Sequence, residues 1–194
     1  MTPTVPTREE ALALLTEFNT TDKAIRHALA VEAVCRHFAR KHGEDEEKWG
    51  AIGLIHDLDY ERFPSEHCKK TAEILRGRSW PEEYIRSAVS HGWGLCSDVE
   101  PVSTMEKVLF AADELTGLVT ATALVRPSKS LADLEARSVK KKWKEKGFAA
   151  GVNRSVIEKG VAMLGVELTA FIDEVIAALR PIAAELGLGG QPPM

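Results

Sequence analysis

The sequence of 194 residues predicts an all-α protein. Apolar residues recur at helical spacing along nearly the whole chain, and no stretch alternates apolar and polar residues as a half-buried strand does. No Asn-Gly hairpin turn is present. Three predicted helix starts carry the capping-box pattern, in which a hydroxyl caps the first turn and an acid three residues later reaches back: Thr7 with Glu10, Ser79 with Glu82, and Ser103 with Glu106.

In chain order, the apolar spacing predicts helices at about residues 8–17, 21–42, 45–57, 67–76, 81–91, 104–124, 131–144, 154–164 and 168–186. Gly43, Gly77 and Gly165 stand where helices should end. Pro181 lies inside the last apolar pattern and should kink that helix. The final segment, GLGGQPPM, is expected to fray. We see no repeat and no linker, and therefore expect one domain over residues 1–194.

Composition excludes several classes of protein. A net charge of −4 gives no general attraction to nucleic acid or to an acidic membrane. No apolar run approaches the ~20 residues that span a bilayer, and the start MTPTVPTREE lacks the pattern of a signal peptide. The three cysteines, Cys35, Cys68 and Cys96, form no CxxC pair, so we expect no disulfide framework and a reducing cytoplasm. Cys68 and Cys96 are expected to be small buried residues.

Histidines and aspartates carry the functional signal. His27 shares a helical stripe with Val31 and Val34, and His56-Asp57 ends the apolar run GLI. A single inward histidine is more often an ordinary core residue than a ligand, and a His-Asp dipeptide often arises by chance. The ordered set carries more weight, because each member falls at an inward or terminal helix position: His27, His56, Asp57, His67, His91 and Asp113.

This set resembles the HD superfamily of metal-dependent phosphohydrolases over about residues 20–125. The arrangement is most similar to bacterial HD-type hydrolases of diadenosine tetraphosphate. The resemblance implies an HD-domain helical bundle followed by a C-terminal helical extension at about residues 126–188. Many dinuclear members have two adjacent histidines where this chain has His91-Gly92, a departure that removes one ligand of the second metal site.

The resemblance also implies a division of labour among the ligands. Asp57 would bridge two ions, with His27, His56 and Asp113 completing one site and His67 and His91 the other. Imidazole and carboxylate ligands suit one or two divalent transition-metal ions, Fe, Mn, Co, Ni or Zn. Such ions activate water for phosphoryl transfer, so no separate nucleophile is needed.

Asp59 and Glu61 follow the metal pair in HDLDYE. Asp59 either orients a ligand imidazole or takes a proton from water, and we count it with Asp57 among the candidate catalytic residues. The alternative is that both acids cap the loop.

Four residues are candidates for substrate binding. The segment 126–154 is rich in Lys and Arg, and Arg126, Lys129 and Arg154 could bind phosphate, or the segment could be an ordinary solvated surface. Trp93, in SHGWGLC, could stack on a base or fill the core.

The resemblance, together with the basic segment 126–154, therefore implies a metal-dependent phosphohydrolase that acts on a phosphate ester or anhydride of a nucleotide-like small molecule, and the cysteine content predicts that it is cytoplasmic. Nucleic acid and membrane are not expected as partners. A homodimer is possible, but the sequence does not decide the oligomeric state. One alternative is an HD-type mixed-valence di-iron oxygenase, which uses the same ligand types. Another is a non-catalytic nucleotide-binding regulatory protein.

Overall fold

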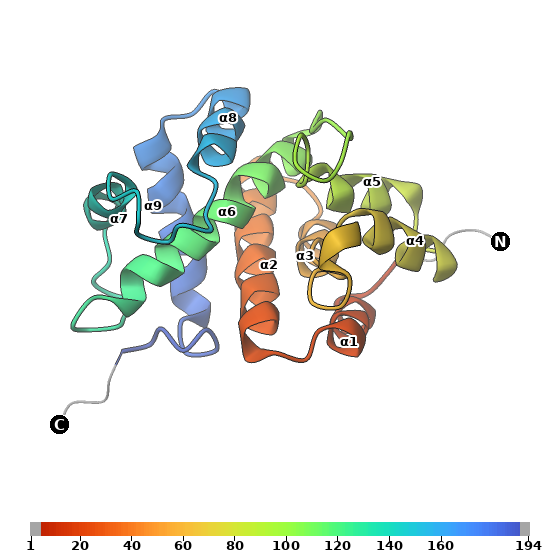
Figure 1. Cartoon of the computed structure of the whole chain (residues 1–194), viewed down its shortest axis with the longest axis horizontal. Helices are drawn as coiled ribbons and strands as arrows, with labels where there is room; N and C mark the ends of the chain where they lie inside the picture. The colour runs from red at the N-terminus through yellow and green to blue at the C-terminus, as the bar shows by residue number, and fades with distance from the viewer. Residues whose placement is uncertain (1–4, 191–194) are drawn as a thin grey trace. The chain divides into compact units, whose positions relative to one another are not determined.

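The computed structural model describes residues 5–190 and confirms an all-α fold (Figure 1). In the described residues the only strand-like pairings are two isolated bridges, Trp93 with Ser97 and Ser130 with Gly189. The helices are α1 (Arg8–Phe18), α2 (Asp22–His42), α3 (Glu46–Ile55), α4 (Lys69–Gly77), α5 (Glu82–Ser90), α6 (Thr104–Leu124), α7 (Ala136–Trp143), α8 (Arg154–Leu164) and α9 (Leu168–Leu179), with short 3-10 helices η1 (Pro64–Glu66) and η2 (Arg180–Ile182).

The chain divides into two compact units, residues 1–110 and residues 111–194, and α6 begins in the first and ends in the second. The single domain expected from the sequence, with a C-terminal extension, stays a prediction. No helix in residues 5–190 combines the length and the apolar character needed to cross a bilayer.

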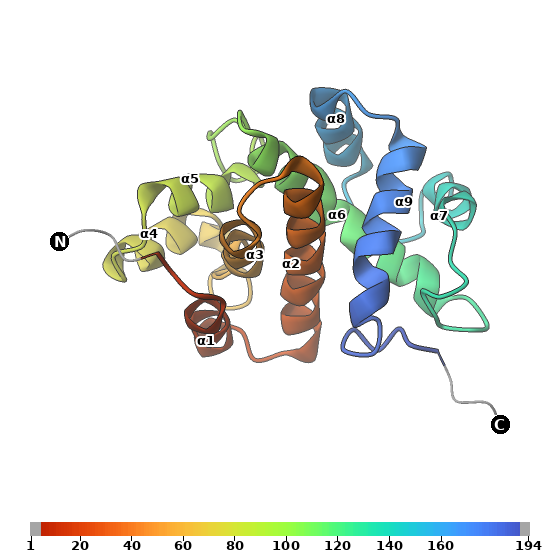
Figure 2. The same cartoon turned by 180° about the vertical axis from the view of Figure 1, so that it is seen from behind.

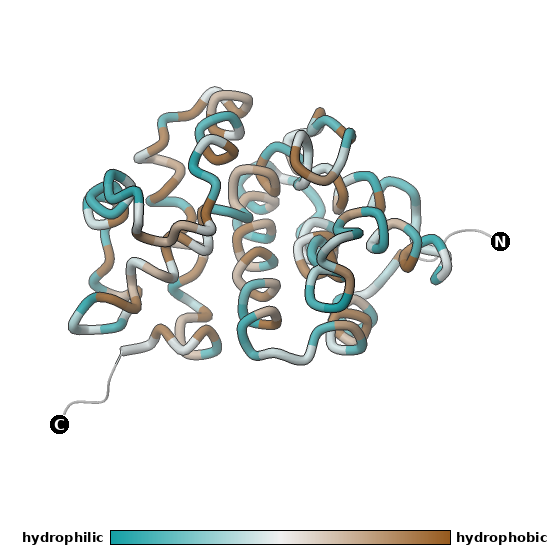
Figure 3. The backbone as a smooth tube through the Cα atoms, in the orientation of Figure 1, coloured by the Kyte–Doolittle hydropathy of each residue, from teal (hydrophilic) through white to brown (hydrophobic). Residues whose placement is uncertain are grey.

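In the first unit, α3 is the central helix, because α1, α2 and α5 all pack against it. Helices α2 and α3 lie side by side in both views (Figures 1 and 2). Polar and apolar residues alternate in bands along α2, as the pattern of an amphipathic helix requires (Figure 3). Its apolar stripe supplies Val31, Val34 and Phe38 to the core, and α3 adds Ile52 and Ile55.

In the second unit, α9 packs against α7 and α8. The predicted helix over residues 131–144 is wrong in its first part, because α7 begins only at Ala136. Leu131 and Leu134 are instead buried in an irregular turn, and their carbonyl groups accept hydrogen bonds from the guanidinium of Arg180 at 3.1 and 2.9 Å.

The C-terminal helix is shorter than predicted. α9 ends at Leu179, and Pro181 lies in the 3-10 helix η2 rather than at a kink within one long helix. Proline has no N–H to continue the α-helical bonding, so the helix stops before it. The chain after η2 is paired rather than frayed, since Leu131 N donates to Leu188 O at 3.0 Å; residues 191–194 of the expected frayed tail lie outside the described residues.

Two of the three predicted capping boxes are present, Thr7 with Glu10 and Ser103 with Glu106. The Ser79–Glu82 box is wrong. Helix α5 begins at Glu82 after Pro81, so the acid is the first helical residue rather than the third, and it bonds Arg76 at 2.8 Å.

Candidate metal centre

Helix ends bring the candidate ligands of the first unit together. His27 lies in the second turn of α2, His56 caps the C-terminus of α3 with Asp57 next to it, and His91 caps the C-terminus of α5. His67 follows η1 and precedes α4, which begins two residues later than predicted. Short loops and helix ends therefore point these side chains to one place.

The carboxylate of Asp57 divides the four histidines into two pairs. Its Oδ2 lies 3.6 Å from Nε2 of His27 and 3.6 Å from Nε2 of His56. Its Oδ1 lies 3.4 Å from Nε2 of His67 and 3.2 Å from Nε2 of His91. Each oxygen thus faces one pair of imidazoles, which is the arrangement a bridging carboxylate needs.

Three of the histidines are oriented through the other ring nitrogen. Nδ1 of His56 lies 2.7 Å from Gly53 O, Nδ1 of His91 lies 2.5 Å from Ala88 O, and Nδ1 of His67 lies 2.7 Å from a carboxylate oxygen. A carbonyl or carboxylate oxygen only accepts, so it keeps the proton on Nδ1. The Nε2 lone pairs are then directed toward Asp57, as in metal-ligating histidines.

The two imidazoles of the second pair need a cation between them. Nε2 of His67 lies 3.1 Å from Nε2 of His91, and two lone pairs at this distance repel unless a proton or a metal ion lies between them. Burial lowers the pKa of His67, but its hydrogen bonds with Asp59 and Cys96 and the charge of Asp57 outweigh burial and raise that pKa to about 10. Without metal, a proton meets this requirement.

Asp59 and Glu61 have different partners. Asp59 is fully buried, and both of its oxygens are bonded: Oδ1 to Nδ1 of His67 and Oδ2 to the backbone N–H of Thr71 at 2.7 Å. Glu61 instead accepts bonds from Thr20 and Thr21 at the start of α2. This geometry suits an orienting role for Asp59 and a capping role for Glu61.

The cluster fits a divalent transition metal. Its donors are imidazole nitrogens and carboxylate oxygens, the set that such ions prefer. His56, Asp57 and His27 offer ligand atoms within 4.8 Å of one another, and so do Asp57, His67 and His91. His56 and His91 are buried, whereas the side chains of His27 and Asp57 are 27% and 22% exposed, so the site is partly accessible to solvent.

The remaining predicted site residues belong largely to the second unit. Asp113 lies on α6 and is the third residue of that unit, and its place among the ligands stays a prediction. Arg126, Lys129 and Arg154 also lie there, and their part in substrate binding stays a prediction.

The two arginines have structural partners. The guanidinium of Arg126 bonds Asp133 and Ser138, and the residue lines a cavity of about 340 Å³. That of Arg154 donates to four backbone carbonyl groups of residues 143–152. Lys129 is exposed.

Trp93 lies in the loop after His91 and is half-buried. Its ring centroid is 6.0 Å from that of Phe110, so part of the side chain belongs to the core of the first unit. Stacking on a substrate base stays a prediction.

Sequence reasoning missed the neighbours of His67. Cys96 is exposed, not buried as predicted, and its sulfur lies beside that of Cys68. No local pattern relates residues 28 positions apart, and the contact depends on how the loops fold back.

Residues 24–118 match the family model described as HD domain. No curated protein and no solved structure gives a significant match to the chain. The matched region contains every histidine and aspartate of the cluster and runs from α2 into α6. The chain therefore belongs to the HD-domain superfamily, most of whose members are metal-dependent phosphohydrolases.

Proposed function

We propose that this protein is a metal-dependent phosphohydrolase that cleaves a phosphate ester or anhydride in a nucleotide-like small molecule through metal-activated water. The observation that carries the proposal is the geometry of Asp57. One of its oxygens faces His27 and His56, and the other faces His67 and His91. A carboxylate shared in this way is the feature expected of a site for two cations.

Each pair of histidines would hold one ion with its own oxygen of Asp57. When bound, divalent transition metals supply Lewis-acid stabilisation of a phosphoryl group and lower the pKa of water. The protein orients the imidazoles: Gly53 O and Ala88 O fix the rings of His56 and His91. Asp59 fixes His67 and, being buried with both oxygens bonded, acts as a positioning residue.

The nucleotide-like substrate rests on the resemblance and on the basic segment 126–154. Trp93 supports it too, because a half-buried ring beside His91 could accept a base. We further propose that the protein works in the cytoplasm, since three cysteines without a CxxC pair suit a reducing compartment.

The test combines metal content with hydrolysis of model phosphate substrates. The full chain, stripped of metal and reloaded separately with Mn²⁺, Fe²⁺, Co²⁺, Ni²⁺ or Zn²⁺, is assayed for release of p-nitrophenol from p-nitrophenyl phosphate and its bis-ester, and for release of nucleotides from a dinucleoside polyphosphate. We expect about two ions per chain, about one in His67→Ala and nearly none in Asp57→Asn, with hydrolysis lost in both variants.

His42→Gln is the matched control, because His42 is an exposed residue in the last turn of α2, outside the cluster. It should bind metal and hydrolyse the same substrates as the wild type. Iron-dependent oxygen uptake without hydrolysis of any substrate would assign the protein to the oxygenases instead. Tight nucleotide binding without turnover would make it a regulatory protein. Absence of bound metal under every supplement would refute the metal centre itself.

A further inference from the structure

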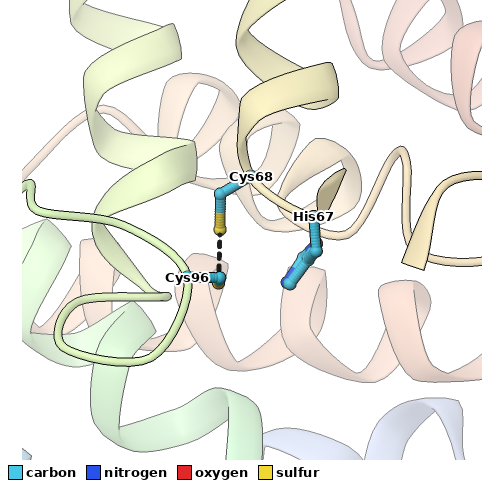
Figure 4. A group of neighbouring side chains, drawn as sticks. All are labelled: His67, Cys68 and Cys96. Carbon is cyan, nitrogen blue, oxygen red and sulfur yellow. Dashed lines mark hydrogen bonds between the residues drawn. The ribbon is translucent and has the colours of Figure 1, made fainter. Parts of the chain in front are cut away.

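Two thiols meet beside the candidate metal centre. Sγ of Cys68 lies 3.0 Å from Sγ of Cys96, and both lie next to His67 (Figure 4). The third cysteine, Cys35, is fully buried on α2. The pair joins two segments that are far apart in sequence, the start of α4 and the loop after α5.

The backbone around each cysteine holds the pair together. Cys68 is the N-cap of α4 and has φ of 66°, a value that a non-glycine residue adopts only when its surroundings impose it. On the other side, the N–H groups of Cys96 and Ser97 both bond Gly92 O, at 2.9 and 3.1 Å, and close a tight turn. A side chain at Gly92 would collide with both sulfur atoms, so glycine is needed there for the pair to form.

We propose that Cys68 and Cys96 form a reversible intramolecular disulfide when the protein meets a peroxide. Cys96 is exposed and is the residue that a peroxide can reach, whereas Cys68 is only 2% exposed and can react only with its neighbour. Because a disulfide bond is about 2.0 Å long, the two sulfur atoms need to approach by only about 1 Å.

The electrons balance with hydrogen peroxide as the oxidant. The sulfur of Cys96 attacks one peroxide oxygen, the O–O bond breaks, and a sulfenic acid and one water result. The sulfur of Cys68 then attacks the sulfur of Cys96, the S–S bond forms, the S–O bond breaks, and a second water leaves with the thiol proton. Two thiols are oxidised by two electrons, and one peroxide is reduced to two waters.

A metal site made of His67 and the two thiols is the competing interpretation of the same cluster. Both ring nitrogens of His67 are already engaged, because Nδ1 bonds Asp59 and Nε2 faces Asp57 and His91. Two sulfur ligands without the imidazole fall short of the four ligands of a structural zinc site. The geometry therefore favours the disulfide.

The bond would join the residue after His67 to the loop that follows His91. It would form at the edge of the candidate metal centre, but its chemistry goes beyond the proposed hydrolysis and does not depend on it. Thiol counting therefore tests the disulfide whether or not the protein binds metal.

In the experiment, the reduced full chain is treated with one equivalent of hydrogen peroxide, alkylated, and digested with trypsin. We expect the thiol count to fall from three to one, and to return to three with dithiothreitol. Mass spectrometry should find peptide 63–69 linked to peptide 87–107, and peptide 27–36, which holds Cys35, alkylated.

Variants make the result specific. Cys35→Ser should still form the disulfide, and Cys96→Ser should lose no thiol because Cys68 is shielded. Cys68→Ser should leave a sulfenic acid on Cys96 that dimedone traps. Gly92→Ala should slow disulfide formation at least about 10-fold by pushing the sulfur atoms apart. If Gly92→Ala does not fold, the three cysteine variants still test whether Cys68 and Cys96 form the disulfide. Disulfide-linked dimers, irreversible oxidation of Cys96 with Cys68 still reduced, or equal loss of Cys35 would each overturn the proposal.

Discussion

Asp59 and Glu61 are two acids only two positions apart, but their surroundings give them different roles. Asp59 is fully buried and bonds His67, whereas Glu61 points to the start of α2 and bonds Thr20 and Thr21. The sequence HDLDYE left open whether either acid supports a ligand or only caps a loop. Their partners separate the two roles.

We expect Asp59→Asn to weaken metal binding at the His67–His91 pair by about 10- to 100-fold. Asparagine has one acceptor oxygen, so its NH₂ group must face either the N–H of Thr71 or Nδ1 of His67, both of which need an acceptor. Competition titrations with a chelator measure the two affinities separately. An equal loss at both pairs, or none, would contradict a positioning role. Glu61→Gln is the neighbouring control and should leave both affinities unchanged.

The hydrogen bonds of Glu61 also predict how the stability of the protein depends on pH. Hydrogen bonds from the Thr20 hydroxyl, and then from the N–H and hydroxyl of Thr21, lower the pKa of Glu61 to about 2. A carboxyl group whose pKa is lower in the folded state stabilises the protein above its unfolded pKa, near 4.3, and loses that effect as the pH falls toward 2. Glu61→Gln should therefore lower Tm at pH 7, and the difference should close between pH 4.5 and 2. A constant difference in calorimetry across that range would refute this assignment.

At the scale of helices, the crossing of α2 and α3 decides whether the metal centre can form. A Cβ on Gly53 would lie 2.9 Å from Cα and 3.1 Å from N of Glu32, so the two helices meet backbone to backbone. His27 lies five residues before Glu32 on α2, and His56 lies three residues after Gly53. The spacing of these helices therefore sets the spacing of the two ligands.

Gly53→Ala should force α2 away from α3, lower stability by about 1–3 kcal/mol, and weaken metal binding at the His27–His56 pair. Urea unfolding and metal titration measure the two effects. Gly77→Ala is the matched control, because no atom lies within 4 Å of its added Cβ and the residue ends α4 with an ordinary backbone. It should leave metal binding unchanged and stability equal or slightly higher. If both substitutions behave alike, helix spacing does not govern the site.

At the scale of the molecule, α6 is the element that belongs to both units, and Asp113 lies on it just inside the second unit. The resemblance implies that this aspartate completes the ligand set of His27 and His56. Its neighbour Glu114 has a partner within the second unit, because it accepts a hydrogen bond from Asn153 N at 2.9 Å. The two adjacent acids therefore form a natural comparison.

Asp113→Asn should weaken metal binding at the His27–His56 pair by about 10-fold or more and leave the His67–His91 pair unchanged, because only the first pair would lose a charged ligand. Glu114→Gln keeps an acceptor for Asn153 and should bind metal like the wild type. Metal titration with elemental analysis distinguishes the variants. Wild-type affinity at both pairs in Asp113→Asn would remove this residue from the ligand set.

Most helices could be predicted because helix formation depends on residues three and four positions apart. The capping boxes at Thr7 and Ser103 and the helix ends at Gly43 and Gly165 are of this local kind. The helix predictions fail where a contact with a distant residue overrides the local helical pattern. Arg180 holds Leu131 and Leu134 in a turn, so α7 begins later than its local pattern indicates.

The sequence by itself determined the all-α class, the order of the helices and the residue types that suit a metal. Only the tertiary structure decided which atoms meet: one oxygen of Asp57 for each histidine pair, Asp59 rather than Glu61 beside His67, and Cys68 against Cys96. The physical reason is that periodicity states which face of a helix is buried. It does not state how helices cross or where their connecting loops return, and the distances between ligand atoms depend on both.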